Sequence, residues 1–146
     1  MENICKAVYE AVRSEYTADS RRTIVSPEDI LAYKQVSRIS GQKQEHVLVL
    51  TLGADSKVIR CRIITKGLMN HSLVHPREVF REAIMDNAHS IIIVHNHPSN
   101  CLTPSSADIE VTKQIVNAGK IIGIELLDHI IVAKAGIASL RRLGCI

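Results

Sequence analysis

The chain has 146 residues, of which 46% are hydrophobic and 23% are charged, as expected for one folded soluble domain. Its net charge is +3, and it contains no run of five basic residues. The charge pattern therefore permits contact with nucleic acid but does not support a dedicated nucleic-acid binder, and no apolar run reaches the ~18 residues of a membrane span.

The first part of the chain carries two helical patterns. Apolar residues recur on one helical face between Asn3 and Tyr16. After a polar stretch, Ser26-Pro27-Glu28-Asp29 combines a hydroxyl cap, a first-turn proline and early acids, so a second helix is expected to run to about Ser40. We interpret residues 1–41 as a helical preface that forms one compact unit with the main domain, residues 42–146.

The next part of the chain alternates between strand and helix patterns. Two short apolar runs, His46–Leu52 and Val58–Thr65, flank a Gly-Ala-Asp-Ser turn and predict a hairpin. A helix is expected to begin at Pro76. The apolar face of this helix should comprise Val79, Phe80, Ala83 and Ile84. The run Ser90–Val94 is apolar on both faces, which is typical of a central, covered strand.

The last third of the chain begins with a loop over residues 96–104. A helix is expected from about Ser105 to Ala118, with Gly119 ending it. The remaining expected elements are strands over Ile121–Leu126 and His129–Ala133 and a short helix over Gly136–Leu143. This order of elements predicts an α/β fold with a mixed β-sheet flanked by helices.

The residues best suited to chemistry follow the buried strand. Residues two apart on an extended chain point to the same side, so His95 and His97 can converge on one point. Asp108 lies in the first turn of the next helix, and the intervening loop can return it to that point. Two imidazoles and one carboxylate form a three-ligand set for catalytic zinc, with the fourth position left for water.

Each of these signals also has a purely structural explanation. An HxH pair on a strand is by itself more often incidental than a metal site. Ser105-x-x-Asp108 also describes a helix N-cap with an acid at the third position. Together, at a strand–loop–helix junction of an α/β protein, the two signals favour a metal. Glu45, at the head of the first strand, is the candidate proton shuttle, and the alternative is an exposed strand-end acid.

The spacing of these residues resembles the JAMM (JAB1/MPN) metalloprotease motif: His95-x-His97, seven residues, Ser105-x-x-Asp108, with Glu45 upstream. The resemblance is closest to the RadC-like branch of bacterial proteins, over about residues 26–133. It is carried by Gln44-Glu45-His46, His75-Pro76-Arg77-Glu78-Val79-Phe80, His95-Asn96-His97-Pro98-Ser99, Thr103-Pro104-Ser105 and Leu127-Asp128-His129-Ile130-Ile131-Val132.

The resemblance implies a cytidine-deaminase-like α/β/α sandwich and a zinc ion held by His95, His97 and Asp108. It also implies that Glu45 acts as general acid/base and that Ser105 stabilises an oxyanion. The implied activity is hydrolysis of a peptide or isopeptide bond in a peptide or protein substrate. The alternative is a non-catalytic RadC-like module associated with DNA repair or a protein complex. The presence of all three ligands and the acid favours the hydrolase.

Two features depart from the family pattern. Asn100 stands where many members have glycine, and asparagine tolerates the left-handed backbone that such a turn uses. Only about forty residues precede Glu45, too few for the helix-hairpin-helix region of longer RadC proteins, which weakens a role on DNA. A nucleobase deaminase is excluded because its H-x-E and P-C-x-x-C patterns do not occur.

Other histidines and the cysteines carry weaker signals. His129 lies in an apolar run, where a core histidine is the expected role and support of a metal ligand is the alternative. His75 is expected at a helix entry. The cysteines form no CxxC pair and no secretory signal begins the chain, so reduced thiols in the cytoplasm are expected. Cys101 lies in the loop beside the proposed metal, where a small loop residue is the expected role and an inhibitory ligand or a redox-sensitive thiol is the alternative.

Overall fold

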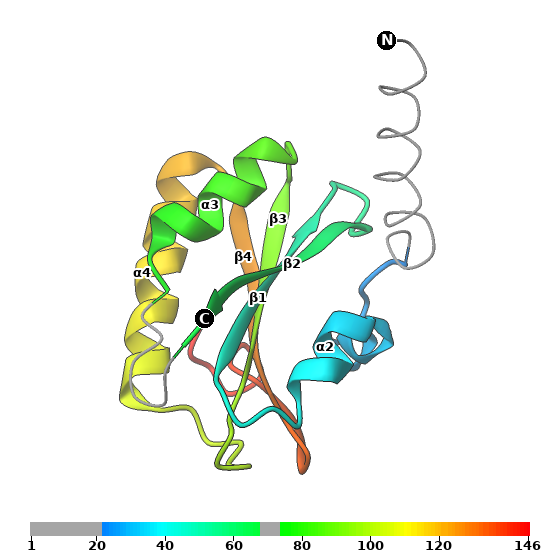
Figure 1. The fold of residues 1–146 in the computed structure, drawn as a ribbon. Coiled ribbons are helices and arrows are strands. Elements are labelled where there is room, and N and C mark those ends of the chain that lie inside the picture. Colours follow the sequence, from blue (N-terminus) through cyan, green and yellow to red (C-terminus); the bar gives the residue numbers. More distant parts are fainter. Residues whose placement is uncertain (1–21, 68–73) are drawn as a thin grey trace, which may run out of the picture.

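The computed structural model describes residues 22–67 and 74–146, and the helix expected over Asn3–Tyr16 lies outside them. The described chain forms a five-stranded sheet of order β2-β1-β3-β4-β5 (Figure 1). The strands are β1 (His46–Leu52), β2 (Val58–Lys66), β3 (Ser90–Asn96), β4 (Glu125–Ala133) and β5 (Gly136–Ser139). β3 pairs with β4 in parallel, whereas the other neighbouring pairs are antiparallel, so the sheet is mixed as predicted.

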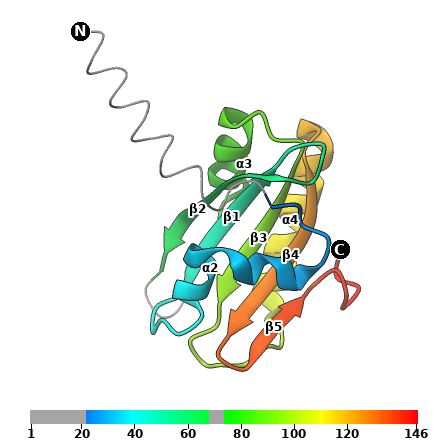
Figure 2. The ribbon, with the colours of Figure 1, turned by 90° about the vertical axis from the view of Figure 1, so that its right-hand side faces the viewer.

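Helices cover both faces of this sheet. They are the 3-10 helix η1 (Pro27–Ala32) and the α-helices α2 (Lys34–Ile39), α3 (Pro76–Met85) and α4 (Ser106–Ile122). α3 and α4 lie on one face, and η1 and α2 lie across the other (Figures 1 and 2). The alternation of side chains along β3 supplies both cores: Ile91 and Ile93 pack with α3 and α4, and Ile92 and Val94 pack with η1 and α2. The predicted α/β/α sandwich is confirmed.

The helix expected from Pro27 to about Ser40 is broken at Tyr33, whose backbone is extended (φ −87°, ψ 120°). The four core residues of this segment recur every three positions: Ile30, Tyr33, Val36 and Ile39. A continuous α-helix has 3.6 residues per turn, so such a series would drift off its buried face. The 3-10 turn and the break let all four reach the core beside the sheet.

Helix α4 ends later than the sequence indicated. It continues through Gly119 to Ile122 and ends at Gly123, whose φ of 82° is left-handed. Gly119 is buried, and a Cβ atom there would lie 2.4 Å from the carbonyl oxygen of Ile124. This glycine is therefore needed for close packing inside the helix, and the strand expected from Ile121 begins only at Glu125.

The two strands expected over residues 121–126 and 129–133 form a single strand with an irregularity. Ile91 pairs with Leu126 and Ile92 pairs with Asp128, so Leu127 is an extra residue in β4. The helix expected over Gly136–Leu143 is also wrong, because its first four residues form β5 and complete an antiparallel pair with β4. Among the described residues, no helix combines the length and apolar character needed to cross a membrane.

One smaller expectation about α3 also fails. Val79, Phe80 and Ala83 are buried as predicted, but Ile84 is 58% exposed. Ile84 lies in the last turn of α3 and off the face that meets the sheet. The helix entry is as expected, since Nδ1 of His75 caps α3 by accepting the backbone N–H of Arg77 at 3.1 Å.

Candidate metal centre

β3 and the residue that follows it bring two histidines to the face of the sheet covered by α4. His95 follows the alternation of Ile91 and Ile93 and is 2% exposed. His97 follows the last residue of β3, and its N–H donates to the carbonyl of Val132 at 3.2 Å, so the extended conformation persists beyond the strand. The two rings can therefore meet on one side of the chain, as the spacing of two predicted.

Asp108 is placed by the start of α4. Ser105 is the N-cap residue, and its Oγ accepts the N–H of Asp108 at 3.1 Å. In return, Oδ2 of Asp108 accepts from the N–H and from the hydroxyl of Ser105, both at 2.7 Å. This reciprocal capping box holds the carboxylate rigidly at the helix N-terminus. The capping role of Ser105 is thus part of the structure, alongside any catalytic role.

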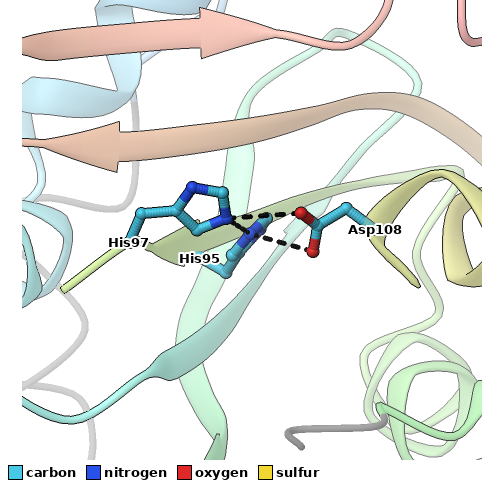
Figure 3. A group of neighbouring side chains, drawn as sticks. All are labelled: His95, His97 and Asp108. Carbon is cyan, nitrogen blue, oxygen red and sulfur yellow. Dashed lines mark hydrogen bonds and ion pairs between the residues drawn. The ribbon is translucent and has the colours of Figure 1, made fainter. Parts of the chain in front are cut away.

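The three side chains face one another across the strand–helix junction (Figure 3). Nε2 of His95 lies 2.8 Å from Nε2 of His97. Oδ1 of Asp108 lies 3.2 Å from Nε2 of His95, and Oδ2 lies 3.3 Å from Nε2 of His97. Within the described parts of the chain, these three form the group of His, Cys, Asp or Glu residues whose ligand atoms all lie within 4.8 Å of one another.

The pKa shifts in this cluster indicate a site that stabilises positive charge. The hydrogen bond with Asp108 raises the pKa of His97 against the opposing effect of burial, and the charge of Glu45 adds to the rise. Burial alone would raise the pKa of Asp108, but hydrogen bonds and charge from His95 and His97 outweigh it and hold that pKa well below its usual range. An ionised carboxylate facing two imidazoles calls for a proton or a metal cation among them.

The donor set fits zinc. Two imidazole nitrogens and one carboxylate oxygen are common ligands of catalytic zinc, and ligand atoms about 2.0–2.1 Å from a tetrahedral ion lie roughly 3.3 Å apart. Each oxygen of Asp108 lies near this distance from one histidine, Oδ1 at 3.2 Å from His95 and Oδ2 at 3.3 Å from His97, while the 2.8 Å between the histidines is shorter. Nδ1 of His97 contacts the carbonyl of Cys101 at 2.7 Å; since a carbonyl only accepts, Nδ1 donates and Nε2 is the ligand atom.

Glu45 directly precedes β1, and Val47, two residues later, pairs with His95. The carboxylate is outside the cluster within 4.8 Å, although its charge acts on His97. The segment that carries Glu45 is attached to β3 by the buried side chain of Asn96. Its Oδ1 accepts the N–H of His46 at 2.6 Å, and its Nδ2 donates to the carbonyls of Gln42 and Gln44 at 3.3 and 2.9 Å.

Two further residues behind His95 carried little or no signal in the sequence. Nδ1 of His95 lies 2.8 Å from Nε2 of His129 on β4, and Nδ1 of His129 lies 2.6 Å from the hydroxyl of Thr112 on α4. Thr112 in turn donates to the carbonyl of Asp108 at 2.6 Å. Burial is the largest cause of the lowered pKa of His129, so this ring is neutral. His129 is a core histidine, as expected, and it also supports His95.

The loop between β3 and α4 contains two residues singled out from the sequence. Asn100 has a left-handed backbone (φ 63°), which asparagine tolerates as expected, and its side chain accepts the N–H of Ala135 at 2.9 Å. Cys101 is an exposed free thiol. Hydrogen bonds from Thr103 lower the pKa of this thiol, but the contact with His97 is made by the Cys101 carbonyl.

The fold and the cluster together define a class of protein: a mixed α/β domain with two histidines and a carboxylate at a strand-to-helix junction. Residues 24–145 match the family model of the RadC-like JAB domain. The chain belongs to this family, and the resemblance seen in the sequence is confirmed.

The curated relatives that the chain resembles include several named UPF0758 protein. One from Methanospirillum hungatei is 56% identical over 124 residues, which is 85% of this chain and 55% of the relative. One from Bacillus cereus is 47% identical over 91% of this chain and 58% of the relative. One from Chlorobium chlorochromatii is 40% identical over 94% and 62%, respectively. The chain thus spans somewhat more than half the length of these relatives.

Proposed function

We propose that the domain binds zinc through His95, His97 and Asp108 and hydrolyses a peptide or isopeptide bond. The observation that carries the proposal is the convergence of two imidazole nitrogens and a carboxylate at one point in a RadC-like JAB domain. Bound zinc supplies Lewis acidity, which acidifies water and polarises a carbonyl group. Many members of the JAB family that carry the JAMM motif are hydrolases, which agrees with this chemistry.

Glu45 would accept the proton of the attacking water and pass it to the leaving amine. Its position supports this role, since the segment is held against β3 by Asn96 and the carboxylate acts electrostatically on His97. An acid in this role must stay near the reacting water without replacing it. Glu45 meets the second part of this requirement, because it lies outside the group of ligand atoms.

Ser105 would donate a hydrogen bond to the oxyanion that forms when the carbonyl is attacked. Its hydroxyl hydrogen is now directed to Oδ2 of Asp108 at 2.7 Å. Donation to the substrate therefore requires the hydroxyl to rotate, while the backbone N–H of Ser105 continues to bind Asp108. The cap and the catalytic role are compatible, because two separate donors of Ser105 reach the carboxylate.

The proposal is tested by comparing the zinc-loaded protein with its Glu45→Gln variant on a library of linear and isopeptide-linked peptides, with cleavage followed by mass spectrometry. We expect cleavage by the wild type and its loss in Glu45→Gln at unchanged zinc content. Glu125→Gln is the matched control, since Glu125 is exposed at the opposite end of the sheet and forms a surface ion pair with Arg141.

Two outcomes would contradict the proposal. If the zinc-loaded wild type cleaves no peptide, the non-catalytic module becomes the better account of the fold. If wild type and Glu45→Gln cleave equally, hydrolysis occurs without the proton transfer assigned to Glu45. In either case a measured zinc stoichiometry of one would leave the metal assignment standing.

A further inference from the structure

Behind the proposed metal centre, a chain of short hydrogen bonds runs from His95 to the backbone of α4. It passes from Nδ1 of His95 to Nε2 of His129, from Nδ1 of His129 to Oγ1 of Thr112, and from Thr112 to the carbonyl of Asp108. The three contacts measure 2.8, 2.6 and 2.6 Å. His95, His129 and Thr112 are at most 2% exposed, so bulk water does not compete for these groups.

The direction of each of these hydrogen bonds is set by the last group in the series, the carbonyl of Asp108. A carbonyl can only accept, so Thr112 donates its single hydroxyl hydrogen to this carbonyl. Oγ1 of Thr112 must then accept from Nδ1–H of His129. A neutral imidazole with its proton on Nδ1 has a lone pair on Nε2, and this lone pair accepts from Nδ1–H of His95.

We infer that Thr112 and His129 form a relay that keeps a proton on Nδ1 of His95 and so reserves Nε2 of His95 for zinc. The inference rests on the proposed metal site and adds two positioning residues to it. Nε2 is the nitrogen of His95 that faces Asp108 and His97. The relay starts from the same residue, Asp108, whose side chain completes the cluster, so the first turn of α4 sets both a ligand and the tautomer of another.

The relay is tested first without any substitution, by ¹⁵N–¹H correlation spectra of the histidine rings. We expect Nδ1 of His129 and Nδ1 of His95 to carry protons and Nε2 of His129 to carry none, in both zinc-free and zinc-loaded protein. A proton on Nε2 of His129 would overturn the inference. This measurement does not depend on whether the protein binds zinc or cleaves a substrate.

The second test removes the hydroxyl that orients the relay. Thr112→Val keeps the shape of the side chain, and we expect it to move the His129 proton towards Nε2 and to weaken zinc binding by about 10–100-fold. Thr112→Ser restores the hydroxyl and should restore both readouts. Thr51→Val is the matched control: Thr51 is equally buried and hydrogen-bonded to Asp86, but it lies four residues along β1 from the partner of His95.

The outcomes separate the relay from the proposed function. If the wild type shows the expected ring protons but binds no zinc, the metal site fails and the relay remains a structural network. If the wild type binds zinc but Thr112→Val changes neither the tautomers nor the affinity, the relay is overturned and the metal site stands. Should Thr112→Val fail to fold, the ring protons of the wild type decide the matter alone.

Discussion

Asn96 allows the account to be tested on stability without any knowledge of the substrate. Its amide lies between the two proposed ligands in sequence but points to the opposite face of β3, where it makes three hydrogen bonds to the segment around Glu45. Each hydrogen bond of this kind contributes about 1 kcal/mol net, so Asn96→Ala should lower the free energy of unfolding by about 3 kcal/mol.

The measurement is urea unfolding of the zinc-free protein, together with amide hydrogen exchange at His46. The N–H of His46 loses its 2.6 Å acceptor in the variant, so its exchange should accelerate more than that of neighbouring β1 amides. Asn117→Ala is the matched control, because Asn117 is exposed on α4 and its replacement should change stability by less than about 0.5 kcal/mol.

Asn96→Asp keeps the shape of the side chain but removes its hydrogen-bond donors. A carboxylate can still accept from the N–H of His46, but it cannot donate to the carbonyls of Gln42 and Gln44. At neutral pH this variant should be at least as unstable as Asn96→Ala. A loss below about 1 kcal/mol for both variants, with unchanged exchange at His46, would refute the assigned role of the amide.

Three further predictions concern residues that are not themselves proposed ligands. Gly119→Ala should destabilise the protein by about 2 kcal/mol, because the added Cβ meets the Ile124 carbonyl, whereas Gly123→Ala should cost about 1 kcal/mol from its left-handed backbone alone. Thermal unfolding compares the two variants, and equal losses of stability would contradict the packing argument. Burial alone raises the pKa of Asp86, but hydrogen bonds and charge from Arg62, Thr51 and Arg60 lower it overall. The ionised Asp86 therefore stabilises the folded protein fully above the unfolded pKa of about 3.9, and this stabilisation is lost as pH falls through the lower folded pKa. The deficit of Asp86→Asn, about 2–3 kcal/mol at pH 7, should therefore shrink on acidification in urea titrations, and a pH-independent deficit would count against the ion pair. Ser105→Ala should cost about 1 kcal/mol through the lost cap of α4, measured by the same unfolding, and a neutral effect would deny the cap.

The proposed ligands could be foreseen from the sequence because they depend on local structure. The alternation of an extended strand sets His95 against His97, and a capping box sets Asp108 against Ser105. Both rules act over a few residues, so the spacing alone carries them. The loop between β3 and α4 then needs only to bring Asp108 back to the two histidines.

For His129, support of a metal ligand was only an alternative in the sequence, and Thr112 carried no signal, because this support depends on pairing between distant segments. His129 reaches His95 only because β4 lies parallel to β3 and carries the extra residue Leu127, which shifts the register. Neither the pairing nor the irregularity is visible in an apolar run. Asn96 was likewise hidden as the middle letter of an HxH motif, and its role is set by its partners some fifty residues earlier in the chain.

The errors at helix ends have a similar origin. Gly119 has the sequence signature of a helix end, yet the close approach of Ile124 requires a glycine inside the helix. Tyr33 has no helix-breaking character, yet burial of a series spaced by three residues breaks the helix there. Tertiary packing overrides local preference at both positions.

The central claim, that His95, His97 and Asp108 bind zinc, is tested most directly by the zinc stoichiometry of the purified chain after equilibrium dialysis. We expect one zinc per chain for the wild type and for the controls His89→Ala and Asp55→Ala, whose residues lie at the opposite end of the sheet. We expect loss of that zinc in His97→Ala and in Asp108→Ala. A wild type that binds no zinc, or two variants that bind it like the wild type, would contradict the claim.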